Sequence, residues 1–375
     1  MSYEQIYNIG RAFQKIARDY PAFPAIISEQ ATISNVQLFA VVVSFAQRMQ
    51  ALGIGRGSLV ALNTGDTVAS LATLMATSLL GSRFVVTSKG LARQKPVQPT
   101  HFLKTAEASG KSGVAFIEID KSWLPQHPVS ASDRLDAFEG YADADDPWMY
   151  LTTSGTTGTP KTLSLSQAAV FGRTMAVGED FPVARTTMAS LFGNTSRPFY
   201  ARALGALLHA GTIVDSLDPG VWRATGVNVV FGSPRQFEQF LDETSIPAPI
   251  ARVEVSGAKL TDELAVRLSE VFRHITDVYG ASETSKSYSN ILTVTAEGKV
   301  VRVGKPLDSI VEIVDDQSNP CAAGVEGYVR VRNSYMSSPY LNAPKANAKA
   351  FVDGWFYPGD IGLLKVISEG SISAG

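Results

Sequence analysis

The chain has 375 residues, which is too long for one small hydrophobic core and suits two or three packed units. Its 33 basic and 35 acidic residues nearly cancel, which argues against a dedicated nucleic-acid binder with a clustered basic excess. Cys321 is the only cysteine, so the sequence excludes an internal disulfide and a cysteine-based zinc site. A cytoplasmic setting is expected, because the first residues lack the apolar run of a secretory signal.

The first strong pattern predicts a helix that begins at Ser34. Ser34 and Gln37 have capping-box spacing, in which each side chain accepts from a backbone amide at the helix start. Gly53 is expected to end this helix and to open a turn into a strand at 59–62. Apolar residues at helical spacing form one face of the helix, namely Leu38, Val41, Val42, Phe45, Met49 and Leu52.

The next apolar stretch, from Val68 to Leu80, is interrupted by Ser and Thr residues and is too short to cross a bilayer. It predicts a buried helix, and no membrane span is expected. Residues 123–147 are rich in Pro, Ser, Asp and Ala, which indicates an irregular connection into a short strand at 148–151.

A Thr/Gly-rich loop, Thr152 to Lys161, follows that strand and carries the strongest chemical signal. Its glycines let backbone amides turn toward an anion, its hydroxyls add donors, and Lys161 adds a positive charge. Because Pro160 precedes the lysine and residues 162–166 alternate like a strand, the loop is not of the Walker type. We interpret it as a phosphate-binding loop between two strands; a plain surface turn is the alternative.

From Val227 onward the pattern predicts strand, helix and strand in alternation, which implies parallel strands. Strands are expected at 227–231, 252–255 and 275–278, with a helix between the last two that carries Leu264, Leu268, Val271 and Phe272 on one face. Glycine- and serine-containing turns follow all three strands. Because ligands bind beyond the carboxyl ends of parallel strands, these turns are expected to converge on one site. After Val301, predicted strands at 311–314 and 328–332 indicate a smaller β-rich unit.

Four segments together resemble the adenylate-forming superfamily, which includes acyl-CoA synthetases, the adenylation domains of peptide synthetases and firefly luciferase. Residues 150–161 are similar to its signature loop, and 256–258 to its adenine-contacting turn. Residues 277–283 resemble its aromatic-Gly-x-Thr-Glu motif, and 354–360 its Gly-Trp-x-x-Thr-Gly-Asp motif, with a proline in place of the threonine. Four motifs in the family's order are far more specific than any one of them.

The resemblance implies a role for each matching residue. Tyr279 stacks on adenine, Asp277 accepts from its exocyclic amine, and Asp360 takes both ribose hydroxyls. Ser282 donates to the α-phosphate, and Glu283 holds Mg²⁺ through a hard oxygen ligand. Thr153, Lys161 and Glu283 are expected to serve catalysis. The remaining residues expected to bind ATP are Ser154, Gly155, Thr156, Thr157 and Gly158 in the loop, and Ser256, Gly257, Ala258, Gly280 and Ala281 in the later motifs.

The implied function is ATP-dependent activation of a small carboxylic acid to an acyl-adenylate, followed by transfer to the thiol of coenzyme A or of a phosphopantetheine carrier protein. The implied fold is α/β, with two parallel-sheet subdomains at 1–185 and 186–303 and a smaller β-barrel-like subdomain at 304–375. Family members continue into a mobile C-terminal domain. The chain is therefore expected to be the large N-terminal part of an acid–thiol ligase, with the C-terminal domain as a possible separate partner.

The acid is only partly indicated by the sequence. Amino-acid-activating members carry an Asp in a Phe-Asp-x-Ser-like run, and residues 191–199 lack it, which disfavours an α-amino acid. Residues expected to line an acyl pocket, with ordinary core packing as the alternative, are Phe192, Asn194, Phe199, Tyr200 and Gly232. A non-catalytic nucleotide-binding protein and one half of a split ligase remain alternative functions, whereas the context of Lys161 disfavours an ATPase or kinase.

Overall fold

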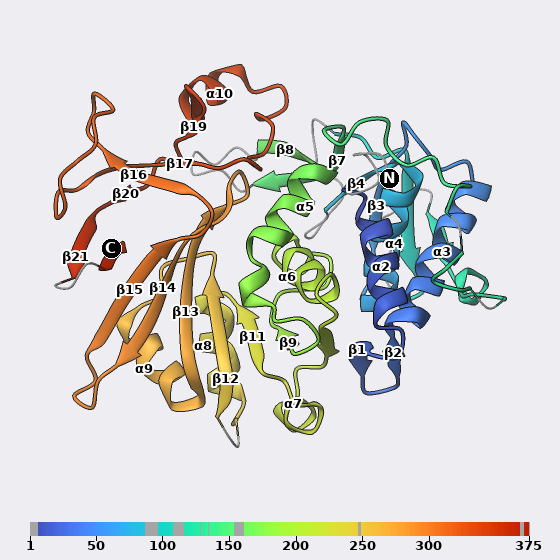
Figure 1. Ribbon diagram of the computed structural model, residues 1–375, viewed down its shortest axis with the longest axis horizontal. Coiled ribbons are helices and arrows are strands. Elements are labelled where there is room, and N and C mark those ends of the chain that lie inside the picture. Colours follow the sequence, from blue (N-terminus) through green and yellow to red (C-terminus); the bar gives the residue numbers. More distant parts are fainter. Residues whose placement is uncertain are drawn as a thin grey trace. The chain divides into compact units, whose positions relative to one another are not determined.

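The chain forms two compact units in the computed structural model, residues 1–186 with 193–215 and residues 187–192 with 216–375. The structure describes residues 7–86, 97–107, 116–127, 129–133, 135–153, 161–246, 249–367 and 371–374. Both units combine helices and strands (Figure 1), which confirms the predicted α/β class. The predicted three-part division, with boundaries after 185 and 303, stays a prediction.

The first unit contains a six-stranded sheet in the order β6-β5-β3-β4-β7-β8. Its strands are parallel except β8, which runs antiparallel to β7. The predicted strands on both sides of the Thr/Gly loop are therefore confirmed. The strand bounds are β3 (Leu59–Asn63), β4 (Arg83–Val85), β5 (His101–Thr105), β6 (Ile117–Ile119), β7 (Pro147–Thr153) and β8 (Lys161–Ser166).

Three helices of the first unit pack against one another: α2 (Ile9–Asp19), α3 (Asn35–Ala51) and α4 (Thr67–Leu80). Helix α3 begins at the predicted capping box of Ser34 and Gln37. Leu52, expected on its buried face, instead lies just past the helix and is exposed. Helix α4 is almost wholly buried, as predicted, and among the described residues no helix is long and apolar enough to cross a membrane.

The rest of the first unit consists of shorter elements. The strands β1 (Pro24–Ser28), β2 (Thr32–Ser34) and β10 (Thr212–Asp215) pair in the order β2-β1-β10. The remaining helical elements of this unit are α5 (Gln167–Ala176), α6 (Arg197–Leu207) and the short 3₁₀ helices η2 (Lys121–Trp123) and η3 (Gly178–Asp180). Between η2 and β7 the described residues are irregular, as predicted.

The second unit is built on a sheet whose strands follow the order β9-β11-β12-β13-β14-β15-β22-β21. The first four strands are parallel, and the remaining pairs are antiparallel. The predicted parallel strands are thus confirmed. Their bounds are β9 (Thr187–Ser190), β11 (Val229–Gly232), β12 (Ile250–Ser256), β13 (Phe272–Ala281), β14 (Ser285–Val294), β15 (Val300–Pro306), β21 (Leu364–Ile367) and β22 (Ser371–Ala374).

Three helices accompany this sheet: α7 (Pro219–Thr225), α8 (Pro234–Glu243) and α9 (Asp262–Val271). Helix α9 packs on β13 and β14, where Figure 1 shows it beside the orange strands. The structure corrects one expectation here, because Phe272 begins β13 instead of ending the helix. A second correction concerns Tyr279 and Gly280, which lie within β13 and not in a turn, since β14 returns antiparallel and pairs with them.

The β-rich part of the second unit is an open sheet of short strands. The predicted strands are confirmed as β16 (Ile310–Val314) and β17 (Gly327–Arg332), which pair antiparallel. Helix α10 (Pro344–Ala350) leads into β18 (Phe351–Val352), β19 (Trp355–Phe356) and β20 (Ile361–Gly362). The described residues of this part form no closed barrel, so the expected barrel-like subdomain is an open sheet here.

Candidate functional site

The two ends of the Thr/Gly loop are held together by the β7–β8 pair of the first unit. Thr153 and Lys161 stand opposite each other at the ends of the two strands. The Thr153 hydroxyl donates to the Lys161 carbonyl at 3.4 Å. Both side chains are partly exposed. The predicted phosphate-binding residues Ser154, Gly155, Thr156, Thr157 and Gly158 lie outside the described residues.

In the second unit, the turn after β12 begins at the carboxyl end of that strand. Ser256 is buried and stands beside Val278 in the parallel register, next to Tyr279. Gly257 has a φ of +95°, a conformation that favours glycine because side chains clash with the backbone there. Gly257 and Ala258 are both exposed, so their backbone can be approached from solvent. The expectation that the turns after the three parallel strands converge on one site stays a prediction.

Tyr279 and Asp360 are brought together although they are distant in the sequence. The Tyr279 hydroxyl donates to Asp360 Oδ2 at 2.7 Å. The Tyr279 ring packs on the small core formed by Ile313, Val329 and Val331, and the Asp360 carbonyl accepts from the Val329 amide at 3.0 Å. Burial, and then the bond to Asp360, raises the pKa of Tyr279 well above its usual range, so its hydroxyl stays a donor at neutral pH.

Asp277 lies two residues before Tyr279 in β13, and the pKa of its carboxyl is raised. Burial raises the pKa of its carboxyl to about 6, while the nearby Arg302 guanidinium opposes this shift. Arg302 is itself fixed, because it forms an ion pair with Asp262 at 2.6 Å and donates to the Leu260 carbonyl at 3.1 Å. Asp277 is therefore a carboxylate acceptor above about pH 6 and becomes a carboxylic acid below it.

Gly280 sits at an irregularity in the pairing of β13 with β14, where the register shifts between Tyr279 and Gly280. A Cβ at Gly280 would lie 2.1 Å from the Ser285 carbonyl oxygen, a distance that real Cβ atoms essentially never show. Ser285 also has a φ of +65°, which is uncommon for a residue other than glycine. This tight backbone turn carries the half-buried Ala281 and Ser282 and directs Glu283 inward.

Glu283 is 5% exposed and is held by a distant segment of the second unit. The Tyr340 hydroxyl donates to Glu283 Oε1 at 2.6 Å, and the Ser337 amide donates to the Glu283 carbonyl at 2.7 Å. Among the described residues no group of three or more His, Cys, Asp or Glu side chains could hold a metal ion. A single carboxylate still fits Mg²⁺, because that ion commonly takes one or two carboxylates together with phosphate oxygens of the substrate.

A buried ion pair near these residues was missed by the sequence reasoning. The Lys286 ammonium lies 2.6 Å from Glu254 Oε2, and the side chains are only 9% and 2% exposed. Lys286 stands opposite Gly280 in β14, and Glu254 lies in β12 between Phe231 and Thr276. The signal that could have revealed it is a single glutamate inside the apolar strand at 252–255.

The predicted acyl-pocket residues are divided between the two units. Phe192 and Gly232 belong to the second unit, where a Cβ at Gly232 would lie 2.8 Å from the Phe237 ring. Asn194, Phe199 and Tyr200 belong to the first unit. There, Tyr200 is 1% exposed and its hydroxyl lies 2.8 Å from Ser70 Oγ, so it packs as a core residue.

The Asn194 amide donates to the Gly65 carbonyl at 2.7 Å, and Ser70 Oγ donates to the Asn194 carbonyl at 2.6 Å. Asn194 is thus fixed at the start of α4 in the first unit. Phe199 is 4% exposed and packs edge-on to Tyr200.

The sequence is similar to a known protein family and to individual enzymes. The family model described as AMP-binding enzyme matches residues 13–341. The chain is 30% identical over 358 residues to 4-chlorobenzoate–CoA ligase of an Arthrobacter species, a match that covers 85% of this chain and 67% of that protein. It is 27% identical over 267 residues to a salicylyl-CoA synthase / salicylate adenylyltransferase of a Streptomyces species, covering 62% of this chain and 45% of that protein.

Solved structures show the same fold. The N-terminal subdomain of NpsA from Klebsiella oxytoca, in complex with 3-hydroxybenzoyl-AMSN, has a TM-score of 0.80 at 19% identity and covers 99% of this chain and 98% of that one. O-succinylbenzoate coenzyme A synthetase from Bacillus subtilis, in complex with ATP and magnesium ion, has a TM-score of 0.79 at 20% identity, covering 97% of this chain and 78% of that one.

Proposed function

Because the chain belongs to the family of AMP-binding, adenylate-forming enzymes, we propose that it binds ATP with Mg²⁺ and activates an aromatic carboxylic acid as its acyl-adenylate. One oxygen of the acid's carboxylate attacks the α-phosphorus, and the bond from that phosphorus to the pyrophosphate oxygen breaks. The products are acyl-adenylate and pyrophosphate. The reaction needs no nucleophile from the protein, so catalysis rests on alignment of the reactants and on charge neutralisation.

The observation that carries this proposal is the cluster of Asp277, Tyr279, Glu283 and Asp360 in the second unit. Asp277 and Tyr279 lie near the carboxyl end of β13, and Glu283 lies in the turn that follows it, at the edge where ligands of parallel sheets bind. Asp360 joins them through its bond to Tyr279. Adenine requires an aromatic ring and an acceptor for its amine, which Tyr279 and Asp277 offer. Ribose requires an acceptor for its hydroxyls, which Asp360 offers, and Mg²⁺ requires a carboxylate such as that of Glu283.

We assign these residues the following roles. Asp277 accepts from the exocyclic amine, the Tyr279 ring stacks on the base, and Asp360 accepts from the ribose hydroxyls. Glu283 holds Mg²⁺, which supplies charge neutralisation for the phosphates when it is bound. Other residues proposed to contact ATP are Ser256, Gly257, Ala258, Gly280, Ala281 and Ser282 in the second unit, and Thr153, Lys161 and the loop between them in the first.

An aromatic acid is favoured over an α-amino acid for two reasons. The segment 191–199 lacks the aspartate that would meet an α-ammonium group, and it presents phenylalanines instead. The relatives at 30% and 27% identity are named for 4-chlorobenzoate and salicylate. We propose that Phe192 and Gly232, both in the second unit, contribute to acyl selection. Phe199 and Tyr200 pack in the core of the first unit, and Asn194 is fixed there at the start of α4, so none of these three is assigned an acyl contact.

The final acceptor is proposed to be a thiol of coenzyme A or of a carrier protein's phosphopantetheine, reached by the whole ligase. The chain spans about two-thirds of the length of the 4-chlorobenzoate–CoA ligase that it matches. We propose adenylation for the residues described above and thioester formation as the step that follows it.

The test is acid-dependent exchange of labelled pyrophosphate into ATP. Benzoate, 4-chlorobenzoate, salicylate and 3-hydroxybenzoate are compared with decanoate and a set of L-amino acids. We expect exchange with one or more aromatic acids, and its loss in Asp360→Ala, with Asp316→Ala, an exposed turn residue, as the matched control. Exchange only with amino acids would overturn the aromatic assignment. ATP binding without exchange for any acid, in this chain and in the full-length enzyme, would favour a non-catalytic nucleotide-binding protein.

A further inference from the structure

We infer that Tyr340 is a positioning residue for Glu283, and that its hydroxyl fixes the carboxylate orientation in which Glu283 receives Mg²⁺. This inference deepens the proposed function and rests on it, because it takes the metal-holding role of Glu283 as its premise. Tyr340 belongs to none of the motifs that the sequence identified.

The contact between the two side chains is short and shielded from water. Tyr340 Oη lies 2.6 Å from Glu283 Oε1, with Tyr340 6% exposed and Glu283 5% exposed. A hydrogen bond to a charged acceptor is stronger than one between neutral groups, and burial strengthens it further. A carboxylate has about four acceptor sites, so accepting from Tyr340 is compatible with binding a cation. The bond therefore selects one rotamer of Glu283 without competing with its proposed role.

Tyr340 is itself held on three sides. Its amide donates to Asn347 Oδ1 at 2.8 Å, and its carbonyl accepts from Asn347 Nδ2 at 2.8 Å, so one asparagine satisfies both backbone groups. The Tyr340 ring packs edge-on to Phe351 with ring centroids 5.3 Å apart. The Ser337 amide, three residues earlier, donates to the Glu283 carbonyl. The segment 337–347 therefore forms hydrogen bonds with both the backbone and the side chain of Glu283.

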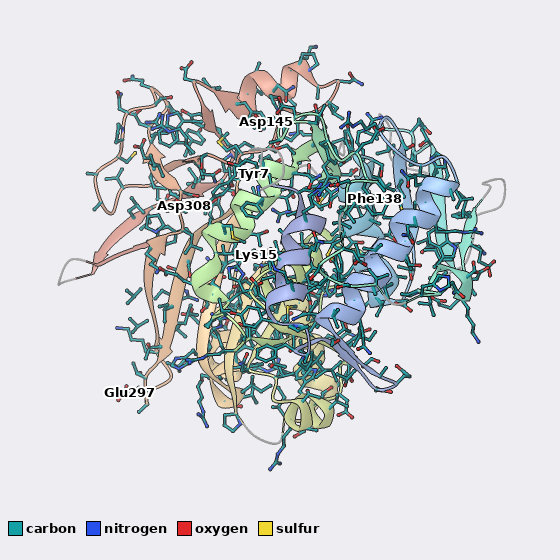
Figure 2. All side chains as sticks on the ribbon, turned by 45° about the vertical axis from the view of Figure 1, so that its right-hand side comes forward. Tyr7, Lys15, Phe138, Asp145, Glu297 and Asp308 are labelled. Atoms are coloured by element: carbon teal, nitrogen blue, oxygen red, sulfur yellow. The ribbon has the colours of Figure 1, made fainter. Side chains whose placement is uncertain are left out.

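This arrangement matches what a metal-binding carboxylate needs. Outer hydrogen-bond partners orient the ligand, and losing one typically lowers metal affinity by about 10–100-fold. A purely structural tyrosine would leave metal affinity unchanged and lower only stability. The two possibilities can be separated with a control tyrosine just before this segment, Tyr335. Its hydroxyl donates to the Asp308 carbonyl at 3.1 Å rather than to Glu283, and Figure 2 labels Asp308.

The experiment measures binding of α,β-methylene-ATP by calorimetry, in excess Mg²⁺ and in EDTA, on the full-length enzyme. We expect Tyr340→Phe to lower the Mg²⁺-dependent gain in affinity by about 10-fold. Its affinity in EDTA should equal that of the unmodified enzyme. Tyr335→Phe should change neither value, and Glu283→Gln should abolish most of the gain. Thermal unfolding of each variant reports any loss of structure.

Asn347→Ala provides a second variant that leaves the Tyr340 hydroxyl in place but removes its backbone partner, and we expect a smaller loss of the Mg²⁺-dependent gain. An unchanged gain in both Tyr340→Phe and Asn347→Ala, with Glu283→Gln defective, would overturn the inference while leaving the proposed function intact. If the unmodified enzyme shows no Mg²⁺-dependent gain and no acid-dependent exchange, the proposed function fails, and the inference with it.

Discussion

The Tyr279 hydroxyl and the Asp360 carboxylate are joined at 2.7 Å across 81 residues of sequence. The bond ties the end of β13 to the residue that precedes β20. In the proposed nucleotide site, the Tyr279 ring contacts the base. The hydroxyl of the same side chain orients the Asp360 carboxylate, which accepts from the ribose.

The first prediction concerns this pair. Tyr279→Phe keeps the ring but removes the donor, and it should weaken AMP binding by about 1 kcal/mol, roughly five-fold, because Asp360 is no longer oriented. Tyr279→Ala should cost more, since base stacking on an aromatic side chain contributes about 1–3 kcal/mol. Calorimetric titration with AMP measures both. Tighter binding by Tyr279→Phe would mean that the tyrosine competes with ribose for Asp360.

Asp277 gives a pH-dependent prediction. Its folded-state pKa of about 6 lies above its ordinary value of 3.8, so its ionisation destabilises the fold. The penalty is absent below about pH 4, grows as the pH rises, and reaches about 3 kcal/mol near pH 7. Asp277→Asn should therefore match the original chain at pH 4 and exceed its stability at pH 7, as measured by urea unfolding. Asp316→Asn, at an exposed turn, should show no such divergence.

The same residue should make nucleotide binding depend on pH. A carboxylate accepts from the exocyclic amine of adenine more strongly than a carboxylic acid does. The affinity for adenosine, which carries no phosphate that titrates in this range, should therefore rise as the pH increases through about 6. In Asp277→Asn this rise should disappear. A pH profile that is the same in both proteins would show that Asp277 does not contact the base.

The bulge at Gly280 predicts a steric effect. Gly280→Ala places a methyl group 2.1 Å from the Ser285 carbonyl oxygen, and the neighbour is backbone that cannot turn aside. We expect a loss of about 1–3 kcal/mol in the free energy of unfolding. Gly55→Ala is the matched control, because nothing lies within 4 Å of a Cβ there, and it should change stability by less than about 0.5 kcal/mol. Equal losses in the two variants would contradict the steric argument.

The buried ion pair of Lys286 and Glu254 predicts that a second substitution restores stability lost by the first. Lys286→Met removes the cation beside Glu254, which is 2% exposed, and should cost about 3–5 kcal/mol in unfolding free energy. Adding Glu254→Gln should recover most of that loss, because the buried negative charge is gone. The exposed pair of Arg267 and Asp242 serves as the comparison: Arg267→Met should cost at most about 1 kcal/mol. The free energy of unfolding is measured by chemical denaturation for the original chain, Lys286→Met, the double variant and Arg267→Met. A double variant as unstable as Lys286→Met would contradict the prediction.

Local features of the fold could be predicted because they depend on neighbouring residues. The capping box at Ser34 needs only residues three apart, and the loop between β7 and β8 follows from Pro160 and the alternation after Lys161. The same local reasoning failed at Phe272 and Gly280. There the strand β13 extends at both ends because pairing with β12 and β14 overrides the helical spacing and the turn tendency of glycine.

The sequence by itself determined the α/β class, the order of the motifs and the chemical character of Asp277, Tyr279, Glu283 and Asp360, because residue type and spacing carry that information. The tertiary structure alone decided which of them meet. Glu283 finds Tyr340 across 57 residues, and Lys286 finds Glu254 across 32. Such contacts depend on strand register and on the path of the chain between them, and burial then sets their strength, so no local pattern encodes them.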